Sequence, residues 1–589
     1  MWTVSFLKPI FKKGEKTDLD NFRGLAIGSA FGKLFSILLN RLMEYIKQKK
    51  LILPNQIGFM KGSGTSDHIF LLQTIIEKVV KKGKKKLYVA FIDFKKAYDT
   101  VNRDILLNHL KSLGINGIFQ RNIAAMYAKT EYQVKLKNEH SPNIQSNLGL
   151  KQGCPLSPML FNLYIDNIKD IFDQTCNPID FQNEKLNHFL YADDLVLMSE
   201  SRAGLQNCLD KVYEFSNKRN LTISVKKSKT MVFNQVGKII DSRFNITSEA
   251  LEQVQSFCYL GFEVKCSGTV KHAMNVLCDK ANKALRPLLC AIARFKISTR
   301  VAIRLFHSYI SPILLYNAEN WAIFSDKTIN TFNNESIFHD TVRSKIDVVH
   351  RKFLKFVMGV SKSSPSLTIF GDTGEVPLSL KSYRLALNFW HRVTNLSEIN
   401  LVKKAVTENI ELRTNWIITI EKLINCLNLA DKIGHHAKFR KITKSQIDKQ
   451  YFDYWKTELS RPGISRMEFY REIKREFGME KYLNIENFDI RKGIAKIRCC
   501  SHSLEIEKGR HNNIARVDRI CKLCDKGEVE TEEHFLLSCN RYDSLKSKYD
   551  LDGCPSIFEL FNNIGQDGLG KFLIEAFSLR ENTLRPAST

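Results

Sequence analysis

Two short apolar runs, residues 189–191 and 195–198, are separated by three residues and lie about one third of the way along the chain. Both runs favour strands, so their spacing predicts a tight β-hairpin. The residues between them include Asp193 and Asp194, which places two carboxylates in the turn. The simpler alternative is a turn that faces water, since Asp is common in turns.

A third carboxylate, Asp93, directly follows the apolar run 87–92, a predicted buried strand. A buried carboxylate without a partner costs several kcal/mol, so a cation is expected beside it. Two Mg²⁺ ions about 4 Å apart can stabilise both the attacking and the leaving oxygen of an in-line phosphoryl displacement. Because Mg²⁺ prefers oxygen ligands, Asp is a suitable residue type for such a site.

Charge limits the class of partner. The chain of 589 residues contains 89 Lys and Arg against 62 Asp and Glu, a formal net charge of +27. This excess favours a polyanion such as nucleic acid, although a solvated Lys-rich surface explains the charge alone equally well. No apolar run reaches the roughly 18 residues of a membrane span, so we expect an intracellular protein without a membrane partner.

Three segments occur in a fixed order: Phe-Ile-Asp-Phe-Lys-Lys-Ala-Tyr-Asp-Thr-Val at 91–101, Gly-Leu-Lys-Gln-Gly-Cys-Pro-Leu-Ser-Pro at 149–158 and Tyr-Ala-Asp-Asp at 191–194. They resemble motifs A, B and C of reverse transcriptases, and are most similar to those of non-LTR (LINE-type) retrotransposons. Further segments resemble the fingers, motif D and the primer grip of that family; they are 11–16, 21–24, 54–59 and 65–67 for the fingers, 221–233 for motif D and 257–261 for the grip. Met60 departs from the family, which often has a basic residue there.

The resemblance implies a metal-binding triad of Asp93, Asp193 and Asp194, with the backbone carbonyl of Phe94 as a further ligand. We call these three aspartates the acidic triad. Asp99, by the same resemblance, is structural.

Other matching residues would contact nucleotide or primer. Tyr98 would lie against the sugar and disfavour ribonucleotides, although a core tyrosine is the alternative. Gln152 and Gly153 would lie beside the incoming nucleotide and template, and Lys227 would meet the triphosphate or act as general acid on pyrophosphate. The weaker triphosphate candidates are Arg23 and Lys13, and the primer grip would consist of Tyr259, Leu260 and Gly261.

A second metal site is predicted near the C-terminus. Cys521 and Cys524 are separated by two residues, His534 follows after nine more and Cys539 after another four. Three thiolates and an imidazole suit tetrahedral Zn²⁺, whereas scattered core cysteines are the alternative. Similar clusters in the resembling family look like zinc knuckles for nucleic acid. Nearby basic residues are expected to form a phosphate-binding surface; they are Lys492, Lys496, Arg498, Lys508, Arg510, Arg516 and Arg519.

The implied fold is α+β: a right-hand polymerase with an antiparallel palm sheet, fingers and a helical thumb, followed by a mainly helical C-terminal region with a zinc-knuckle-like cluster. Apolar residues at helical spacing from about residue 271 to 480 support the helical part. Five regions are predicted: 1–85 fingers with a truncated start, 86–268 palm with interleaved fingers and motifs A to E, 269–400 thumb, 401–485 helical connector and 486–589 basic C-terminal region.

The implied activity is RNA-directed DNA polymerisation, a two-metal nucleotidyl transfer onto a primer 3′ hydroxyl, target-primed in a complete element. The cofactors would be two Mg²⁺, replaceable by Mn²⁺, and a structural Zn²⁺. The partners would be an RNA template, a DNA primer or target and deoxynucleoside triphosphates, in the nucleus and cytoplasm. We find no endonuclease or ribonuclease H pattern, so a fragment is expected. Two alternatives stay open. The first is a catalytically silent retroelement relic or RNA-binding protein, and the second is a group II intron maturase.

Overall fold

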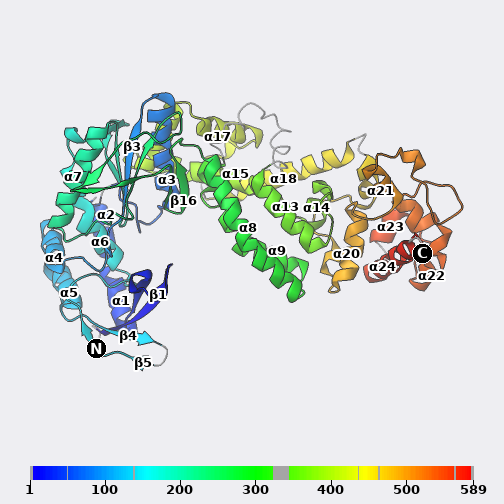
Figure 1. Cartoon of the computed structure of the whole chain (residues 1–589), viewed down its shortest axis with the longest axis horizontal. Helices are drawn as coiled ribbons and strands as arrows, with labels where there is room; N and C mark the ends of the chain where they lie inside the picture. The colour runs from blue at the N-terminus through cyan, green and yellow to red at the C-terminus, as the bar shows by residue number, and fades with distance from the viewer. Residues whose placement is uncertain are drawn as a thin grey trace. The chain divides into compact units, whose positions relative to one another are not determined.

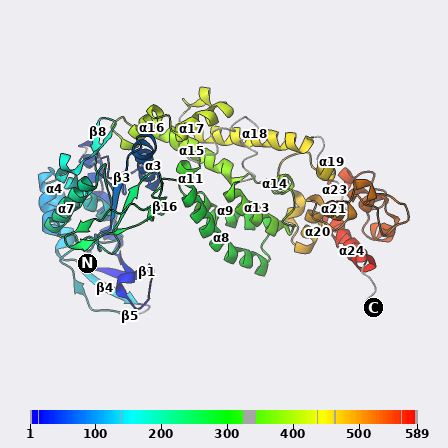
Figure 2. The same ribbon diagram turned by 45° about the horizontal axis from the view of Figure 1, so that its top comes forward.

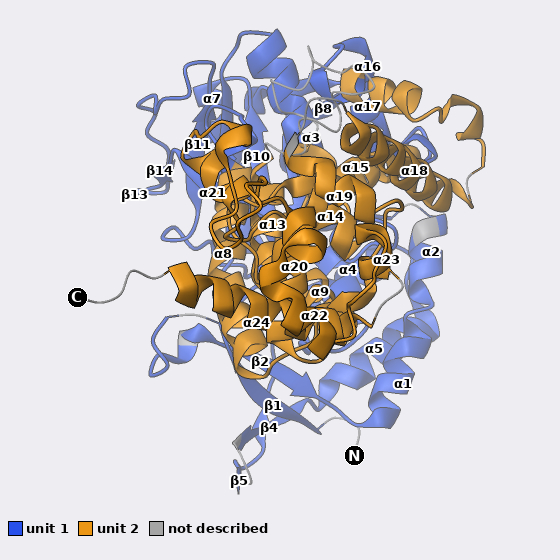
Figure 3. Ribbon diagram, turned by 90° about the vertical axis from the view of Figure 1, so that its right-hand side faces the viewer, with its two compact units in different colours: residues 1–272, 392–417 blue, residues 273–391, 418–589 orange. Residues whose placement is uncertain are grey.

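The computed structural model describes residues 4–12, 14–49, 51–52, 54–136, 139–322, 344–435, 437–461, 465–562 and 565–584. They divide into two compact units, coloured separately in Figure 3. Unit 1 comprises Met1–His272 and Arg392–Ile417, and unit 2 comprises Ala273–His391 and Ile418–Thr589.

The centre of unit 1 is a sheet of five strands in the order β14-β11-β3-β10-β9 (Figure 1). Its bounds are β3 Leu87–Ile92, β9 His188–Tyr191, β10 Asp194–Ser199, β11 Lys229–Phe233 and β14 Glu252–Gln253. The neighbours β11, β3, β10 and β9 are antiparallel, and the short β14 is parallel to β11.

Both faces of this sheet are covered, which explains why β3 is apolar at almost every position. On one face, Ala90 and Ile92 join a core with helix α7 (Arg202–Lys218) and helix α6 (Ser157–Ile165). On the other face, Phe91 stacks on Phe257 of the hairpin β15 (Ser256–Tyr259) and β16 (Phe262–Lys265), with ring centroids 4.3 Å apart.

A second sheet of unit 1 contains β2-β1-β4-β5, with β6 also paired to β4. The strands are β1 Val4–Phe11, β2 Phe22–Ile27, β4 Glu131–Leu136, β5 Glu139–His140 and β6 Ile144–Gln145. The helices between β2 and β4 in sequence include α1 Ala30–Leu39, α4 Arg103–Ser112 and α5 Gly117–Ala128.

A late segment of the chain returns to unit 1. Helix α16 (Leu401–Glu411) packs along helix α3 (Thr65–Ile76) (Figure 2). Asn409 donates a hydrogen bond to the Thr74 hydroxyl at 2.8 Å, and both side chains are buried. The core of unit 1 therefore depends on residues more than 300 positions apart in sequence.

Unit 2 is helical. Its longer helices include α8 Lys271–Arg294, α9 Thr299–Tyr309, α13 Lys345–Met358, α14 Ser366–Thr373, α15 Leu378–Thr394, α18 Phe439–Ser460, α20 Phe488–Arg498 and α24 Gln566–Leu584. The apolar residues of α13 recur at helical spacing and are buried, as expected for an amphipathic helix that packs on others. The predicted α+β class, antiparallel central sheet and helical later half are confirmed.

The predicted division into five regions stays a prediction. None of the helices in the described part of the chain combines the length and the apolar character required to cross a bilayer.

Candidate active site

The acidic triad gathers at one end of the central sheet. Ile92 of β3 lies opposite Leu195 of β10, and Tyr191 of β9 lies opposite Asp194. Extended by one residue, the first register places Asp93 opposite Asp194 across the antiparallel pair. The hairpin predicted from the two apolar runs therefore brings motifs A and C together.

The turn that carries two of these carboxylates is braced by Gln56. Ala192 in the turn has φ +56, a left-handed conformation that costs an L residue about 1 kcal/mol. Its N–H donates to Gln56 Oε1 at 3.0 Å, and Gln56 Nε2 donates to its carbonyl at 3.3 Å. A Cβ on Gly58 would lie 2.2 Å from Ala192 N, so only Gly permits this close approach. Our sequence analysis assigned residues 54–59 to the fingers and missed this contact with motif C.

The triad carboxylates repel one another. Partial exclusion of water and the charges of Asp193 and Asp93 raise the pKa of Asp194 to about 7, and burial followed by the charge of Asp93 raises that of Asp193. The triad is a loose group: its three carboxylates do not all place a ligand atom within 4.8 Å of the others. Two other groups of His, Cys or Glu among the described residues do so. The chemistry of the three carboxylates fits hard divalent cations, whose charge would relieve this repulsion.

A basic group faces the triad. Lys227 Nζ lies 3.6 Å from Asp93 Oδ2, on the segment predicted as motif D. Partial burial, then the positive charges of Arg23 and Lys227, lower the pKa of Lys12. The charges of Arg23 and Lys227 thus act on Lys12, and we call these three residues the basic group. Lys12 was missed in the sequence, while the predicted Lys13 lies outside the described residues.

Asp93 is also held by its backbone. Its N–H donates to Ser228 Oγ at 3.1 Å, and its carbonyl accepts from Ser224 N at 2.8 Å. Phe94 forms an antiparallel bridge with Ile223, flanked by the hydrogen bonds of its two neighbours. In such a pair the Phe94 carbonyl points away from residues 222–224 and stays available as a ligand.

The predicted nucleotide-binding residues of motifs A and B lie beside β2. The Tyr98 ring stacks on Phe161 with centroids 4.7 Å apart, and its buried hydroxyl has no hydrogen-bond partner among the described residues. Gln152 donates to Asp99 Oδ1 at 2.9 Å, which gives Asp99 the structural contact expected of it.

Gly153 has φ +105, and a Cβ there would approach the Ala26 carbonyl to 3.0 Å. The Gln152 carbonyl accepts from Ala26 N at 2.8 Å, which links the motif B loop to the strand that carries Arg23. Backbone contact with β2 therefore requires glycine at position 153 in this structure.

The predicted primer grip is the turn of the β15–β16 hairpin. Leu260 and Gly261 have φ +47 and +81, which matches a two-residue type I′ turn. The buried Tyr259 hydroxyl lies 3.2 Å from His68 Nδ1 of α3. Burial and the charge of Asp194 raise the pKa of Tyr259, so the hairpin reaches the vicinity of the triad.

The C-terminal Cys521, Cys524, His534 and Cys539 converge, with ligand atoms all within 4.8 Å of one another. We call this set the Cys/His cluster. His534 Nε2 faces Cys524 Sγ at 3.4 Å, while Nδ1 lies 2.7 Å from the Glu528 carboxylate. A carboxylate on the second ring nitrogen is the usual way to orient a metal-bound histidine, so the cluster fits a metal ion.

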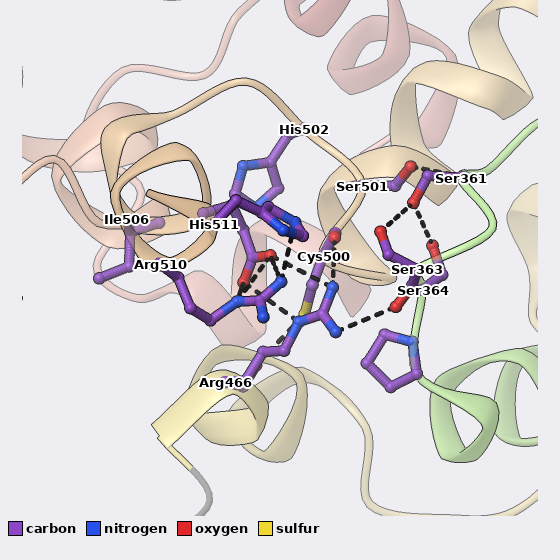
Figure 4. A network of polar contacts seen from close by, with 12 residues as sticks. Ser361, Ser363, Ser364, Arg466, Cys500, Ser501, His502, Ile506, Arg510 and His511 are labelled. Atoms are coloured by element: carbon purple, nitrogen blue, oxygen red, sulfur yellow. Dashed lines mark hydrogen bonds and ion pairs between the residues drawn. The ribbon is translucent and has the colours of Figure 1, made fainter. Parts of the chain in front are cut away.

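The prediction that Arg498 belongs to a basic surface near the Cys/His cluster is wrong. This side chain is buried and donates two hydrogen bonds, at 2.8 and 2.9 Å, to buried Asp372. Arg510 is also engaged, because its guanidinium lies 2.8 Å from Glu507 Oε2, and Arg466 lies 3.2 Å from the same oxygen. Figure 4 shows the guanidinium groups of Arg466 and Arg510 in one network of polar contacts. Arg498 and Arg510 therefore form ion pairs inside unit 2, whereas the sequence predicts that they bind phosphate.

Arg516 and Arg519 are likewise engaged. Arg516 pairs with Glu468 at 2.6 Å, and Arg519 donates to the Ile514 and Ile506 carbonyls at 2.8 to 3.0 Å. Of the seven predicted residues only Arg498 is buried, whereas Lys508 and Arg516 are exposed and the others are partly exposed.

Comparison with known proteins agrees with this geometry. Residues 10–264 match the family model described as reverse transcriptase (RNA-dependent DNA polymerase). The chain is 26% identical over 346 residues to the Pol polyprotein of the type-1 retrotransposable element R2 of Popillia japonica, covering 56% of this chain and 47% of the relative. The corresponding R2 polyprotein of Nasonia vitripennis is 27% identical over 277 residues, covering 45% and 26%.

Among solved structures, apo telomerase from Candida tropicalis aligns with a TM-score of 0.32 and 14% identity over 45% of this chain and 54% of that chain. The chain spans less than half the length of the curated R2 relatives described above. Residues 10–264 thus match the reverse transcriptase family model, and the chain is similar in sequence to retrotransposon R2 polyproteins.

Proposed function

We propose that this chain is an RNA-directed DNA polymerase that adds deoxynucleotides to a primer 3′ hydroxyl while copying an RNA template. The observation that carries the proposal is the strand register that sets Asp93 opposite Asp194, with Lys227 Nζ 3.6 Å from Asp93 Oδ2. Carboxylates for metal and cations for a triphosphate are the two components that nucleotidyl transfer requires.

Each component has a role in the reaction. The primer 3′ oxygen attacks the α-phosphate, the bond to the β-phosphate breaks, and pyrophosphate leaves. The acidic triad and the Phe94 carbonyl would hold two Mg²⁺ ions, or Mn²⁺, which when bound stabilise the attacking and leaving oxygens. Lys12 and Arg23 neutralise triphosphate charge, and Lys227 donates a proton to the departing pyrophosphate.

The remaining predicted residues position the substrates. The Tyr98 ring, fixed against Phe161, excludes a 2′ hydroxyl, and its unpartnered Oη lies beside the sugar. Gly153 lets the motif B loop pack against β2, which would place this loop beside the incoming nucleotide and template, and the Tyr259–Gly261 turn holds the primer end.

The Cys/His cluster is proposed to hold one structural Zn²⁺, with Glu528 orienting His534. The zinc-bearing region would bind template RNA or target DNA. In a complete element the polymerase would extend a nicked target and copy its RNA in place, and the protein would occur in the nucleus and the cytoplasm.

Primer extension on an RNA template tests this proposal. Wild-type protein should extend a DNA primer with Mg²⁺, and Asp193→Asn should lower the rate by about a hundredfold or more. Asp180→Asn is the matched control, because Asp180 is an exposed residue of the same unit and pairs only with Lys185 among the described residues. Failure of folded, RNA-binding wild-type protein to extend the primer contradicts the proposal.

A further inference from the structure

A second group of metal-ligating side chains lies in unit 2, far in sequence from every motif discussed above. His307 is on α9, His350 is on α13, and Glu375 follows α14. Their ligand atoms all lie within 4.8 Å of one another. Helix α13 packs against both α9 and α14 (Figure 1), so three separate segments supply one ligand each.

The His350 ring is the unexplained member of this group. It is completely buried, with Phe306 stacked on it at a centroid distance of 5.1 Å and Phe370 at 5.7 Å. Neither ring nitrogen has a hydrogen-bond partner among the described residues, and Nε2 lies 3.7 Å from Glu375 Oε2. Leaving a buried polar group unsatisfied costs about 1–3 kcal/mol, so an orphaned ring nitrogen aimed at a carboxylate calls for a bound partner.

We propose that His307, His350 and Glu375 form a binding site for a divalent transition-metal ion, with Zn²⁺ as the preferred ion. Two imidazoles and one carboxylate select zinc over magnesium, since nitrogen ligands suit Zn²⁺ and Mg²⁺ prefers an all-oxygen shell. Burial lowers the pKa of His350 to about 3, which keeps the ring in the neutral form that binds metal. Three protein ligands leave one tetrahedral position for water.

The ammonium group of Lys381 competes with the metal ion for the position between the ligands. Its ammonium lies 3.3 Å from His307 Nε2 and 3.6 Å from Glu375 Oε2, so it supplies a positive charge where the ion would sit. The side chain also lines a cavity of about 200 Å³ beside Glu375, which gives the lysine room to swing away and gives an ion a path to the ligands. The site therefore exchanges an internal ammonium for a metal ion.

The bound ion would fasten α9, α13 and the turn between α14 and α15 to one another. A metal-dependent rigidity of this helical bundle is the physical consequence, and it does not depend on the proposed polymerase activity.

Zinc content of the full-length protein tests the proposal. Chelator-treated wild type is reloaded with zinc, passed over a desalting column and measured by mass spectrometry, beside His307→Gln and Glu375→Gln. Each variant should bind about one zinc ion fewer per chain than wild type. Asp448→Asn is the matched control, because Asp448 lines the neighbouring cavity but does not belong to the ligand group.

Cobalt separates this site from the Cys/His cluster, since only thiolate ligands give intense charge-transfer absorption. Both variants should keep that absorption while losing one cobalt ion. Lys381→Met, which removes the competing charge, should bind zinc at this site about tenfold more tightly than wild type. If His307→Gln and Glu375→Gln retain the full zinc content of wild type, the proposal is wrong and the group is an ordinary ion pair between Glu375 and Lys381.

Discussion

The acidic triad of unit 1 and the Cys/His cluster of unit 2 are both made of metal ligands, yet the protein holds them differently. The four ligand atoms of the cluster converge within 4.8 Å, whereas the three carboxylates of the triad do not form so tight a group. Three members of the cluster are buried, but Asp194 is exposed. A closed four-ligand site suits a structural ion, while separated, accessible carboxylates leave positions for substrate oxygens.

Replacement of Asp194 should give the largest difference between the two sites. Asp194→Asn should lower the rate of nucleotide addition by about a hundredfold or more, because a metal-binding carboxylate is lost.

The melting temperature of Asp194→Asn should not fall below that of the wild type. The folded-state pKa of Asp194 is raised to about 7, so its ionised form opposes folding above its unfolded pKa. Thermal melting at neutral pH and single-turnover kinetics measure the two effects; a drop in stability without loss of rate would reverse the assignment.

At the Cys/His cluster, by contrast, a substitution or chelation should affect zinc affinity and RNA binding more than the rate of nucleotide addition. Glu528→Gln weakens the carboxylate contact with His534 and should reduce zinc affinity by about 10- to 100-fold. Chelation of the wild type should reduce RNA binding more than it reduces addition to a preformed duplex. Competition with a chromogenic chelator gives the affinity, and filter binding beside primer extension gives the ratio. Equal loss of binding and extension would abolish the distinction between the two sites.

A smaller effect is expected from the brace of the motif C turn. Gln56→Ala removes two hydrogen bonds to Ala192 and should slow nucleotide addition by about tenfold, a free-energy change of roughly 1–1.5 kcal/mol. Steady-state kinetics at saturating template measure this change, with Gln206→Ala as a control, because the partly buried Gln206 likewise exchanges two hydrogen bonds with one backbone residue, Asn245. An unchanged rate would mean that the turn holds its conformation without Gln56.

Local pattern was enough to predict the parts of this site that depend on neighbouring residues. The apolar runs beside Asp93 and Asp193 predicted strands, because short, continuously apolar runs are typical of strands that are covered on both faces. The resemblance to reverse transcriptases then indicated which strands belong together.

Contacts between distant residues could not be predicted in this way. Gln56 and Ala192 are 136 positions apart, and Ser228 is 135 positions from Asp93. Arg498 was assigned to a basic surface because nothing near it in sequence reveals that Asp372, 126 positions away, pairs with it in the core. The Gln182 and Glu408 contact at 3.0 Å, which joins a hairpin to α16, was missed for the same reason.

The central claim is that the acidic triad catalyses nucleotide addition. Incorporation of one deoxynucleotide into a preformed RNA–DNA primer-template duplex tests it most directly, with purified wild type and Asp93→Asn, first without divalent ions and then with Mg²⁺. The account predicts incorporation only by the wild type and only after Mg²⁺ is added. Incorporation by Asp93→Asn at the wild-type rate, or none by wild-type protein that binds the duplex, would contradict it.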